Sequence, residues 1–137
     1  MKIGIFPMVG DLLHTGHIKA LEYAKSKCDY LIAAMNCDPT IDNPNKNKPI
    51  ESVYERFTRL DSCKYIDKVI PYVGEKDLLL LLQTTNYNIR FIGADHKGGY
   101  TGDDYEKEKG IEVVIIPRPH NESSTNLRQR CIKADQK

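Results

Sequence analysis

Gly10-Asp11-Leu12-Leu13-His14-Thr15-Gly16-His17-Ile18 is the segment from which the expected fold of this 137-residue chain follows. The apolar run before it, Ile3-Gly4-Ile5-Phe6, is typical of a buried parallel strand. Apolar residues at helical spacing follow it, namely Ile18, Leu21, Tyr23 and Ala24. The sequence therefore predicts that two imidazoles and a glycine lie where a first strand turns into a first helix.

This turn has the features of an anion-binding site. In an open α/β sheet, ligands bind in the crevice at the carboxyl ends of the strands. A helix N-terminus in that crevice presents free N–H groups and the positive end of its dipole. Gly16 has no Cβ and lets a phosphate approach the backbone closely. His14 and His17 share a helical turn and face the same way, so the pattern indicates phosphate binding.

The histidine pair is also compatible with two simpler roles. Neighbouring histidines are often solvated surface residues or part of a helix cap. A His-x-x-His pair can also hold zinc, but such a site needs a third protein ligand, and there is no His-Glu-x-x-His motif. A metal protein using His14, His17, His96 and His120 would carry stoichiometric zinc after purification.

Composition limits the class of protein. We expect a single domain over residues 1–137. A formal net charge of +1 argues against bulk nucleic-acid binding and against a membrane-surface patch. The cysteines, Cys28, Cys37, Cys63 and Cys131, form no Cys-x-x-Cys motif and suit reduced thiols. No apolar run has signal-peptide character or membrane-spanning length, so we expect a cytoplasmic protein without membrane insertion.

Strand and helix patterns alternate along the chain. Strands are predicted over residues 2–6, 29–35, 68–71, 88–92 and 112–116, and loops over 38–49 and 93–103. Helices are predicted over 17–27, from the Ser52-x-x-Glu55 capping box to about 63, over the leucine run 78–82 capped by Asp77, and from Ser123 or Ser124 to about 133. This alternation predicts an α/β fold, a Rossmann-like doubly wound five-stranded parallel sheet with helices on both faces. The leucine run is expected to be a core or subunit-contact helix.

Two further segments should meet the histidine turn, because they follow the fourth and fifth strands. The first is Gly93-Ala94-Asp95-His96, and the second is Arg118-Pro119-His120-Asn121-Glu122-Ser123-Ser124-Thr125. Hydroxyls at the start of a helix offer donors to phosphate oxygens. An ordinary helix cap accounts for one serine, but it accounts less well for an arginine followed by three hydroxyls.

Basic residues form a third group. Lys46 and Lys48 lie in the loop after the second strand, Arg56 on the next helix, and Lys64 near its end. Each alone is more often a solvated surface charge. As a set around one crevice, they suit a phosphorylated co-substrate.

Together these motifs resemble the HxGH nucleotidyltransferase superfamily and, within it, the cytidylyltransferase-like family. The resemblance covers essentially the whole chain and is greatest to glycerol-3-phosphate cytidylyltransferases. Three places depart from the family pattern: Met8-Val9-Gly10-Asp11 replaces Gly-x-Phe-Asp, Lys64 replaces an arginine, and Asn121-Glu122 replaces Gly-Ile. Asn36-Cys37-Asp38 with Lys48-Pro49 also resembles heptose-phosphate adenylyltransferase domains.

The resemblance implies transfer of CMP from CTP to a small phosphomonoester, with glycerol 3-phosphate as the best match and release of pyrophosphate. The expected product is a CDP-alcohol for cell-surface polymer or lipid synthesis. The expected cofactor is Mg²⁺ and the expected assembly a homodimer.

The site residues expected from motif and resemblance fall into four groups. The catalytic set is His14, His17, Lys46 and Arg118. The nucleotide-binding set is Pro7, Met8, Val9, Gly10, Asp11, Gly16, Gly93, Asp95, Arg118, Ser123, Ser124 and Thr125. The acceptor-phosphate set is Lys46, Lys48, Arg56 and Lys64. Asp11 is the candidate for orienting the turn or binding the metal.

Two alternatives in function stay open. An adenylyltransferase acting on a sugar phosphate would prefer ATP to CTP. A non-catalytic nucleotide-binding module, suggested by the departures at Lys64 and Asn121-Glu122, would bind CTP without releasing pyrophosphate. Choline phosphate and ethanolamine phosphate also stay open as acceptors.

Overall fold

A sheet of five parallel strands forms the centre of the molecule, in the order β3-β2-β1-β4-β5. The structure is a computed structural model that describes residues 1–94, 99–117 and 124–135, without the side chains of 124–128 and 135. The strands are β1 (Ile3–Met8), β2 (Tyr30–Asn36), β3 (Lys68–Tyr72), β4 (Ile89–Gly93) and β5 (Glu112–Ile116). The chain reverses its direction of winding between β1 and β4, which is where ligands bind in such sheets. The predicted doubly wound parallel sheet is confirmed.

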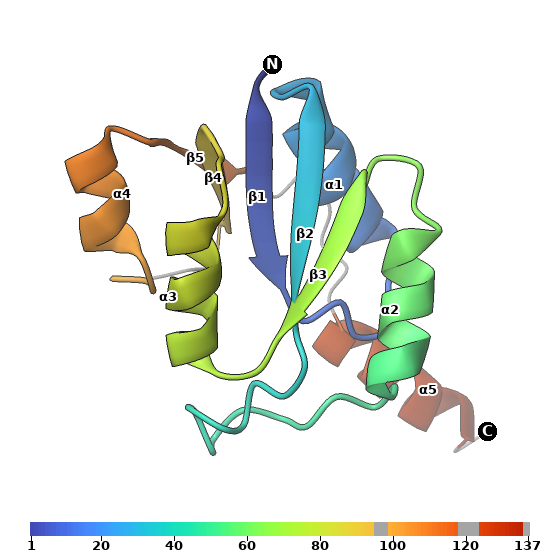
Figure 1. Ribbon diagram of the computed structural model, residues 1–137. Coiled ribbons are helices and arrows are strands. Elements are labelled where there is room, and N and C mark those ends of the chain that lie inside the picture. Colours follow the sequence, from blue (N-terminus) through green and yellow to red (C-terminus); the bar gives the residue numbers. More distant parts are fainter. Residues whose placement is uncertain (95–98, 118–123, 136–137) are drawn as a thin grey trace.

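Helices cover both faces of this sheet (Figure 1). They are α1 (Thr15–Ser26), α2 (Val53–Asp61), α3 (Glu75–Thr84), α4 (Asp103–Lys109) and α5 (Ser124–Asp135). Helices α1 and α2 pack on one face, and α3 and α4 on the other (Figure 1). No helix in the described residues is long and apolar enough to cross a membrane.

Each face has its own hydrophobic core, because successive residues of a strand point to opposite sides of the sheet. In β2, Leu31 and Met35 join the core under α1 and α2, whereas Ile32 joins the core under α3 and α4. Leu78 and Leu82 of the leucine run are buried in that second core. The run therefore supplies two residues to the core, whereas Leu80 is 60% exposed, so the prediction of a subunit contact stays a prediction.

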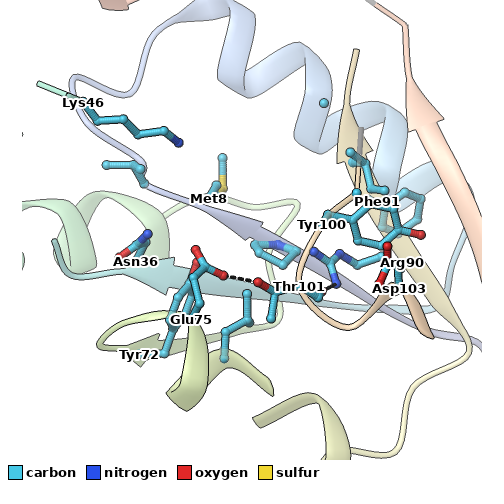
Figure 2. A pocket seen from close by; sticks show the side chains of 16 residues that line it. Met8, Asn36, Lys46, Tyr72, Glu75, Arg90, Phe91, Tyr100, Thr101 and Asp103 are labelled. Atoms are coloured by element: carbon cyan, nitrogen blue, oxygen red, sulfur yellow. Dashed lines mark hydrogen bonds between the residues drawn. The ribbon is translucent and has the colours of Figure 1, made fainter. Parts of the chain in front are cut away.

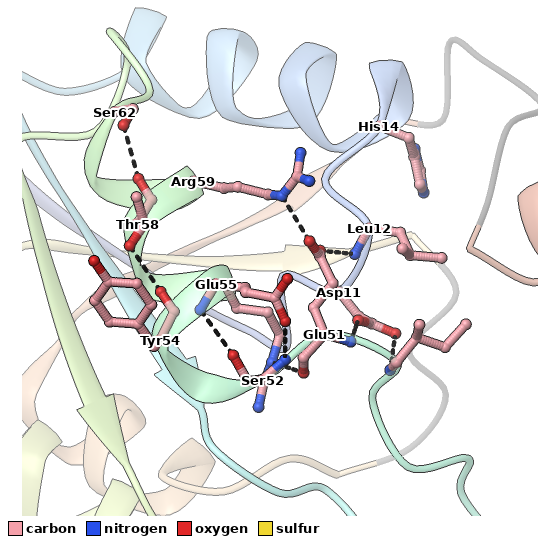
Figure 3. Close-up of polar contacts among 12 residues, drawn as sticks. Asp11, Leu12, His14, Glu51, Ser52, Tyr54, Glu55, Thr58, Arg59 and Ser62 are labelled. Carbon is pink, nitrogen blue, oxygen red and sulfur yellow. Dashed lines mark hydrogen bonds and ion pairs between the residues drawn. The ribbon is translucent and has the colours of Figure 1, made fainter.

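Helix α2 begins with the predicted capping box. The Ser52 hydroxyl accepts a hydrogen bond from the Glu55 amide at 3.1 Å, and the Glu55 carboxylate accepts one from the Ser52 amide at 3.0 Å. These two bonds satisfy amides that the first turn of a helix otherwise leaves unpaired. They also fix the start of α2 at the carboxyl edge of the sheet, next to the β1–α1 turn (Figure 3).

Helix α4 is absent from the predicted elements, although its sequence carries a local signal. Asp103, Asp104 and Glu106 lie in its first turn, and its last turn is basic, which complements the helix dipole. Gly110 ends it with a φ of 71°, a left-handed conformation that favours glycine. Helix α3 also begins earlier than predicted, at Glu75.

Candidate functional site

The turn between β1 and α1 is held in an unusual conformation by the loop that precedes α2. Gly10 and Leu12 have φ values of 72° and 50°, in the left-handed region. The Asp11 carboxylate accepts hydrogen bonds from the amides of Ile50 and Glu51, each at 2.9 Å. The Glu51 carboxylate in turn accepts one from the Leu12 amide at 2.7 Å (Figure 3). This reciprocal pairing fixes where the following helix starts.

The two histidines of the motif form the cap of α1. The Nδ1 of His14 accepts a hydrogen bond from the Gly16 amide at 3.0 Å, and the Nδ1 of His17 accepts one from the His14 amide at 3.2 Å. The rings stack with their centroids 4.0 Å apart. In a neutral imidazole one nitrogen accepts and the other donates, so both Nε2 atoms carry the proton. Both rings therefore present an N–H donor.

Burial keeps His17 neutral. The pKa of His17 falls from 6.5 to about 4, mainly because burial disfavours the charged ring and secondly because two adjacent imidazoles, His14 and His17, repel each other when both are charged. Asp11 acts in the opposite direction but does not offset these effects. At neutral pH, His17 is therefore an uncharged hydrogen-bond donor.

This pKa shift predicts a loss of stability in acid. Between pH 6.5 and about 4 the unfolded chain binds more protons at His17 than the folded chain, so stability falls as the pH falls. From pH 7 to 4.5 the wild type should lose about 2 to 3 kcal/mol more unfolding free energy than His17→Asn, which has no titrating ring. Urea unfolding at the two pH values measures this difference. Equal losses in the two proteins would contradict the assignment of the shift to His17.

Two cavities open at the carboxyl edge of the sheet. The histidine cavity has a volume of about 520 Å³, and its lining includes Gly10, Asp11 and His17. The α3-side cavity has a volume of about 590 Å³, and its lining includes Asn36, Tyr72, Glu75, Arg90, Tyr100, Thr101 and Asp103 (Figure 2). Both cavities are lined by Pro7, Met8, Val9, Lys46 and Gly93. The end of β1 and Lys46 thus form a boundary between two adjoining spaces.

Most of the predicted N-terminal site residues meet at these cavities. Gly16 lies at the α1 cap, hydrogen-bonded to His14. Helix α5, which begins at Ser124 and includes Thr125, lies near the carboxyl edge of the sheet (Figure 1). The predictions for Asp95, Arg118 and Ser123, and for the side chains of Ser124 and Thr125, lie outside the described residues.

Arg56 is not at the surface of either cavity. Its side chain is only 2% exposed and donates to four backbone carbonyls. Nη1 donates to Val9 at 3.0 Å and to Asn36 at 2.7 Å, Nη2 to Cys37 at 2.6 Å, and Nε to Glu51 at 3.2 Å. These contacts give Arg56 a structural role, joining the ends of β1 and β2 to α2, in place of the predicted contact with an acceptor phosphate.

The remaining predicted cations lie in two different places. Lys64 follows α2 and precedes β3, so it lies at the amino edge of the sheet, on the order of 14 Å along α2 from the site. Its ammonium lies 5.2 Å from the centre of the Tyr65 ring. The structure therefore does not bring Lys64 to either cavity, which disfavours its predicted contact with the acceptor phosphate. Lys48 is exposed, with its ammonium 3.8 Å from the Asp38 carboxylate, on the same loop as Lys46.

Asp11 orients the turn and is not placed to act as a metal ligand. It is only 5% exposed, and both of its carboxylate oxygens already accept backbone amides. Among the described residues, no group of three or more His, Cys, Asp or Glu side chains is arranged to hold a metal ion. Of the two roles predicted for Asp11, the structure therefore favours the first.

Sequence reasoning missed the polar lining of the α3-side cavity. Asn36 ends β2, and Arg90 is a charged residue inside the apolar run of β4. A charged side chain in an otherwise apolar strand was the available signal, since such residues are rarely buried without a partner. Glu75 comes from the start of α3, and Thr101 comes from the segment before α4. Neither residue directly follows a predicted strand, so no sequence pattern indicated that they would reach the cavity.

Comparison with known proteins gives consistent matches. The family model described as cytidylyltransferase-like matches residues 5–130. Glycerol-3-phosphate cytidylyltransferase from Bacillus subtilis is 35% identical over 120 residues, which are 87% of this chain and 88% of that protein. Bifunctional protein HldE from Paramagnetospirillum magneticum is 31% identical over 127 residues, which are 91% of this chain but 26% of that protein. The crystal structure of a lipopolysaccharide core biosynthesis protein from Thermoplasma volcanium matches with a TM-score of 0.74 and 26% identity, covering 88% of this chain and 99% of that one.

Proposed function

This chain belongs to the cytidylyltransferase-like family and is a nucleotidyltransferase, and on that basis we propose that it transfers CMP from CTP to glycerol 3-phosphate. The products are pyrophosphate and a CDP-alcohol. Support for the cytidyl donor and for this acceptor comes from the relative in Bacillus subtilis, which the chain matches over nearly its full length.

The observation that carries the proposal is the pair of imidazole donors at the histidine turn. Both Nδ1 atoms are fixed by backbone amides, so each Nε2 atom carries a proton that can be donated to a phosphate oxygen. The donors are held in place before substrate arrives, and such preorganised donors stabilise charge that develops in a transition state. His17 lines the histidine cavity, and this supports binding of a triphosphate there with its α-phosphorus near the imidazole donors.

The reaction itself needs no general base. The nucleophile is an oxygen of the acceptor phosphate, which is ionised at neutral pH. It attacks the α-phosphorus of CTP in line, a new oxygen–phosphorus bond forms, and the bond between the α-phosphorus and the bridging oxygen breaks to release pyrophosphate. Positioning and charge neutralisation then account for catalysis. Lys46 lines both cavities, which supports a role for its ammonium group in neutralising both substrates.

Nucleotidyltransferases of this family generally use a divalent metal, and we propose Mg²⁺ here. The described residues hold no cluster of protein ligands for it. This suits Mg²⁺, which keeps much of its water and is commonly held by substrate phosphates together with few protein groups. When bound, it neutralises phosphate charge.

A second candidate is transfer of AMP from ATP to a sugar phosphate. It is favoured by the 31% identity to an HldE protein and by Asn36-Cys37-Asp38 at the end of β2. A pyrophosphate-release assay over four nucleotides and a panel of phosphomonoesters separates the two. We expect turnover with CTP and glycerol 3-phosphate. Preference for ATP would favour the second candidate, and nucleotide binding without pyrophosphate release under any condition would contradict both.

The role of Lys46 gives a separate prediction. Lys46→Met should lower kcat/KM by about 10- to 100-fold, because removing a charge-assisted contact with phosphate costs about 1.5 to 3 kcal/mol. Lys48→Met, in the same loop but paired with Asp38 and largely exposed, is the matched control and should change kcat/KM less than about fivefold. Steady-state kinetics measure both. Equal effects of the two substitutions would remove Lys46 from the site.

A further inference from the structure

We propose that the α3-side cavity binds the hydroxyl-bearing part of the acceptor and that Asn36 and Glu75 recognise its hydroxyl groups. The inference rests on the proposed function and narrows its acceptor to polyol or sugar phosphates, in contrast to amino-alcohol phosphates. It assigns specificity to side chains outside the histidine turn, one of which belongs to the Asn36-Cys37-Asp38 segment.

Asn36 provides the first observation. It is the last residue of β2, lines the α3-side cavity and is only 9% exposed. Its Oδ1 atom has no hydrogen-bond partner among the residues that the structure describes. Buried amide oxygens are nearly always paired, because leaving one unpaired costs folding free energy. A ligand hydroxyl that donates to Oδ1 would supply the missing partner.

Arg90 provides the second observation, on another strand of the same cavity. It is 5% exposed, and its Nη1 atom donates to the Thr101 carbonyl at 2.9 Å and to Glu106 at 3.3 Å. Its Nε atom, however, is buried without a partner among the described residues. Two residues of the lining thus each carry a buried, unpaired polar atom, an acceptor in Asn36 and a donor in Arg90. Hydroxyl groups match such a lining, since each hydroxyl both donates and accepts.

Glu75 and Thr101 extend the polar lining across the cavity. The Thr101 hydroxyl donates to the Glu75 carboxylate, which connects the start of α3 to the segment before α4 (Figure 2). A carboxylate has several acceptor positions, so Glu75 can accept from a ligand hydroxyl in addition to Thr101. Such carboxylate–hydroxyl contacts are charge-assisted and short, and they suit a polyol.

The same lining is poorly suited to choline or ethanolamine phosphate. Quaternary ammonium groups are recognised by the open faces of aromatic rings. The Tyr100 ring is already covered by the Arg90 guanidinium, which lies 4.9 Å from the ring centre. The other two rings of the lining, those of Tyr72 and Phe91, are only 5% and 0% exposed, so they present little open face to an ammonium group.

The position of the cavity fits the direction of the reaction. It shares Lys46 and the end of β1 with the histidine cavity. An acceptor whose phosphate lies beside Lys46 can therefore direct that phosphate toward the histidines and extend its hydroxyl-bearing body toward Asn36. A nucleotide in the histidine cavity and an acceptor in the α3-side cavity would meet at this boundary.

The test compares Asn36→Leu, which removes the amide oxygen at similar size, with Asn36→Asp, which keeps an oxygen acceptor. Calorimetry measures the binding of glycerol 3-phosphate, a hexitol phosphate, propyl phosphate (which has no hydroxyl) and choline phosphate. The wild type should bind the two polyol phosphates more tightly than the other two. In Asn36→Leu the preference for glycerol 3-phosphate over propyl phosphate should fall about 5- to 30-fold, the effect of one hydrogen bond to a buried group, and Asn36→Asp should keep more of it.

Thermal unfolding adds a readout that a structural role would not give. Because Oδ1 is unpaired, Asn36→Leu should unfold at the same temperature as the wild type or a higher one. A lower temperature together with equally weakened binding of glycerol 3-phosphate and propyl phosphate would overturn the inference. So would an unchanged preference in Asn36→Leu, tighter binding of choline phosphate by the wild type, or no binding of either polyol phosphate. Absence of pyrophosphate release with every nucleotide would instead contradict the proposed function, because the binding preference is measured without turnover.

Discussion

His17→Asn is expected to lower kcat for nucleotidyl transfer by about 100- to 1000-fold, the usual effect of removing one preorganised transition-state donor. The asparagine oxygen can still accept the hydrogen bond from the His14 amide that the Nδ1 atom accepts in the wild type at 3.2 Å. What is lost is the Nε2–H group. The substitution therefore separates the donor from the helix cap, and steady-state pyrophosphate release measures the result.

His17→Gln is the matched variant. Its amide nitrogen reaches closer to the Nε2 position, so it should retain more activity than His17→Asn while losing the contact with the His14 amide. Circular dichroism and thermal unfolding at pH 7 should show that both variants keep the fold. Turnover of His17→Asn within about tenfold of the wild type would contradict the role given to this imidazole.

Arg56→Met is expected to lower the free energy of unfolding by at least about 3 kcal/mol, or Tm by about 10 °C. The methionine fills part of the buried volume but leaves the four carbonyls that the guanidinium satisfies without their donors. A domain of ordinary stability has only about 5 to 15 kcal/mol in total. Urea or thermal unfolding measures the loss, and expression yield is expected to fall with it.

Lys64→Met is the matched control for Arg56→Met, because it replaces an exposed cation by the same residue. Lys64 is exposed at the amino edge of the sheet and contacts the Tyr65 ring, so its loss should cost less than about 1 kcal/mol. It should also leave kcat/KM for the acceptor unchanged. If Arg56→Met were as stable as Lys64→Met, the structural role of Arg56 would be contradicted. A loss of acceptor affinity in Lys64→Met would return Lys64 to the site.

The sheet and the histidine turn were predictable because their signals are local. The continuous apolar runs of β1 and β2 require burial on both faces, which a parallel sheet with helices on both sides provides. The positions of His14 and Gly16 soon after such a run then place them at a strand-to-helix turn. The capping box at Ser52 and Glu55 is likewise a pattern of a few adjacent residues.

The role of Arg56 was not predictable, because its four acceptors come from three separate segments of the chain. A sequence shows a charge on a helix but not that the ends of β1 and β2 turn their carbonyls toward it. The same limit applies to Asp11, whose partners Ile50 and Glu51 are 39 and 40 positions away. Both residues carry charge near the proposed phosphate site and use it to hold the backbone there.

The second cavity was missed for a related reason. Its polar groups come from β2, α3, β4 and the segment before α4, and each alone is an ordinary surface residue type. Only their arrangement shows that Asn36 and Arg90 are buried with unpaired atoms beside one cavity. Sequence reasoning predicted where the reacting phosphates bind, whereas the structure was needed to find the groups proposed to select the acceptor.

The chemical step proposed at the histidine turn can be followed with glycerol 3-phosphate whose phosphate oxygens are labelled with ¹⁸O. During turnover with CTP, ³¹P NMR shows which product carries the label. Attack by the acceptor phosphate on the α-phosphorus predicts a labelled oxygen between the two phosphorus atoms of the CDP-alcohol and unlabelled pyrophosphate. Release of CDP and orthophosphate, or label in the pyrophosphate, would contradict nucleotidyl transfer at this turn.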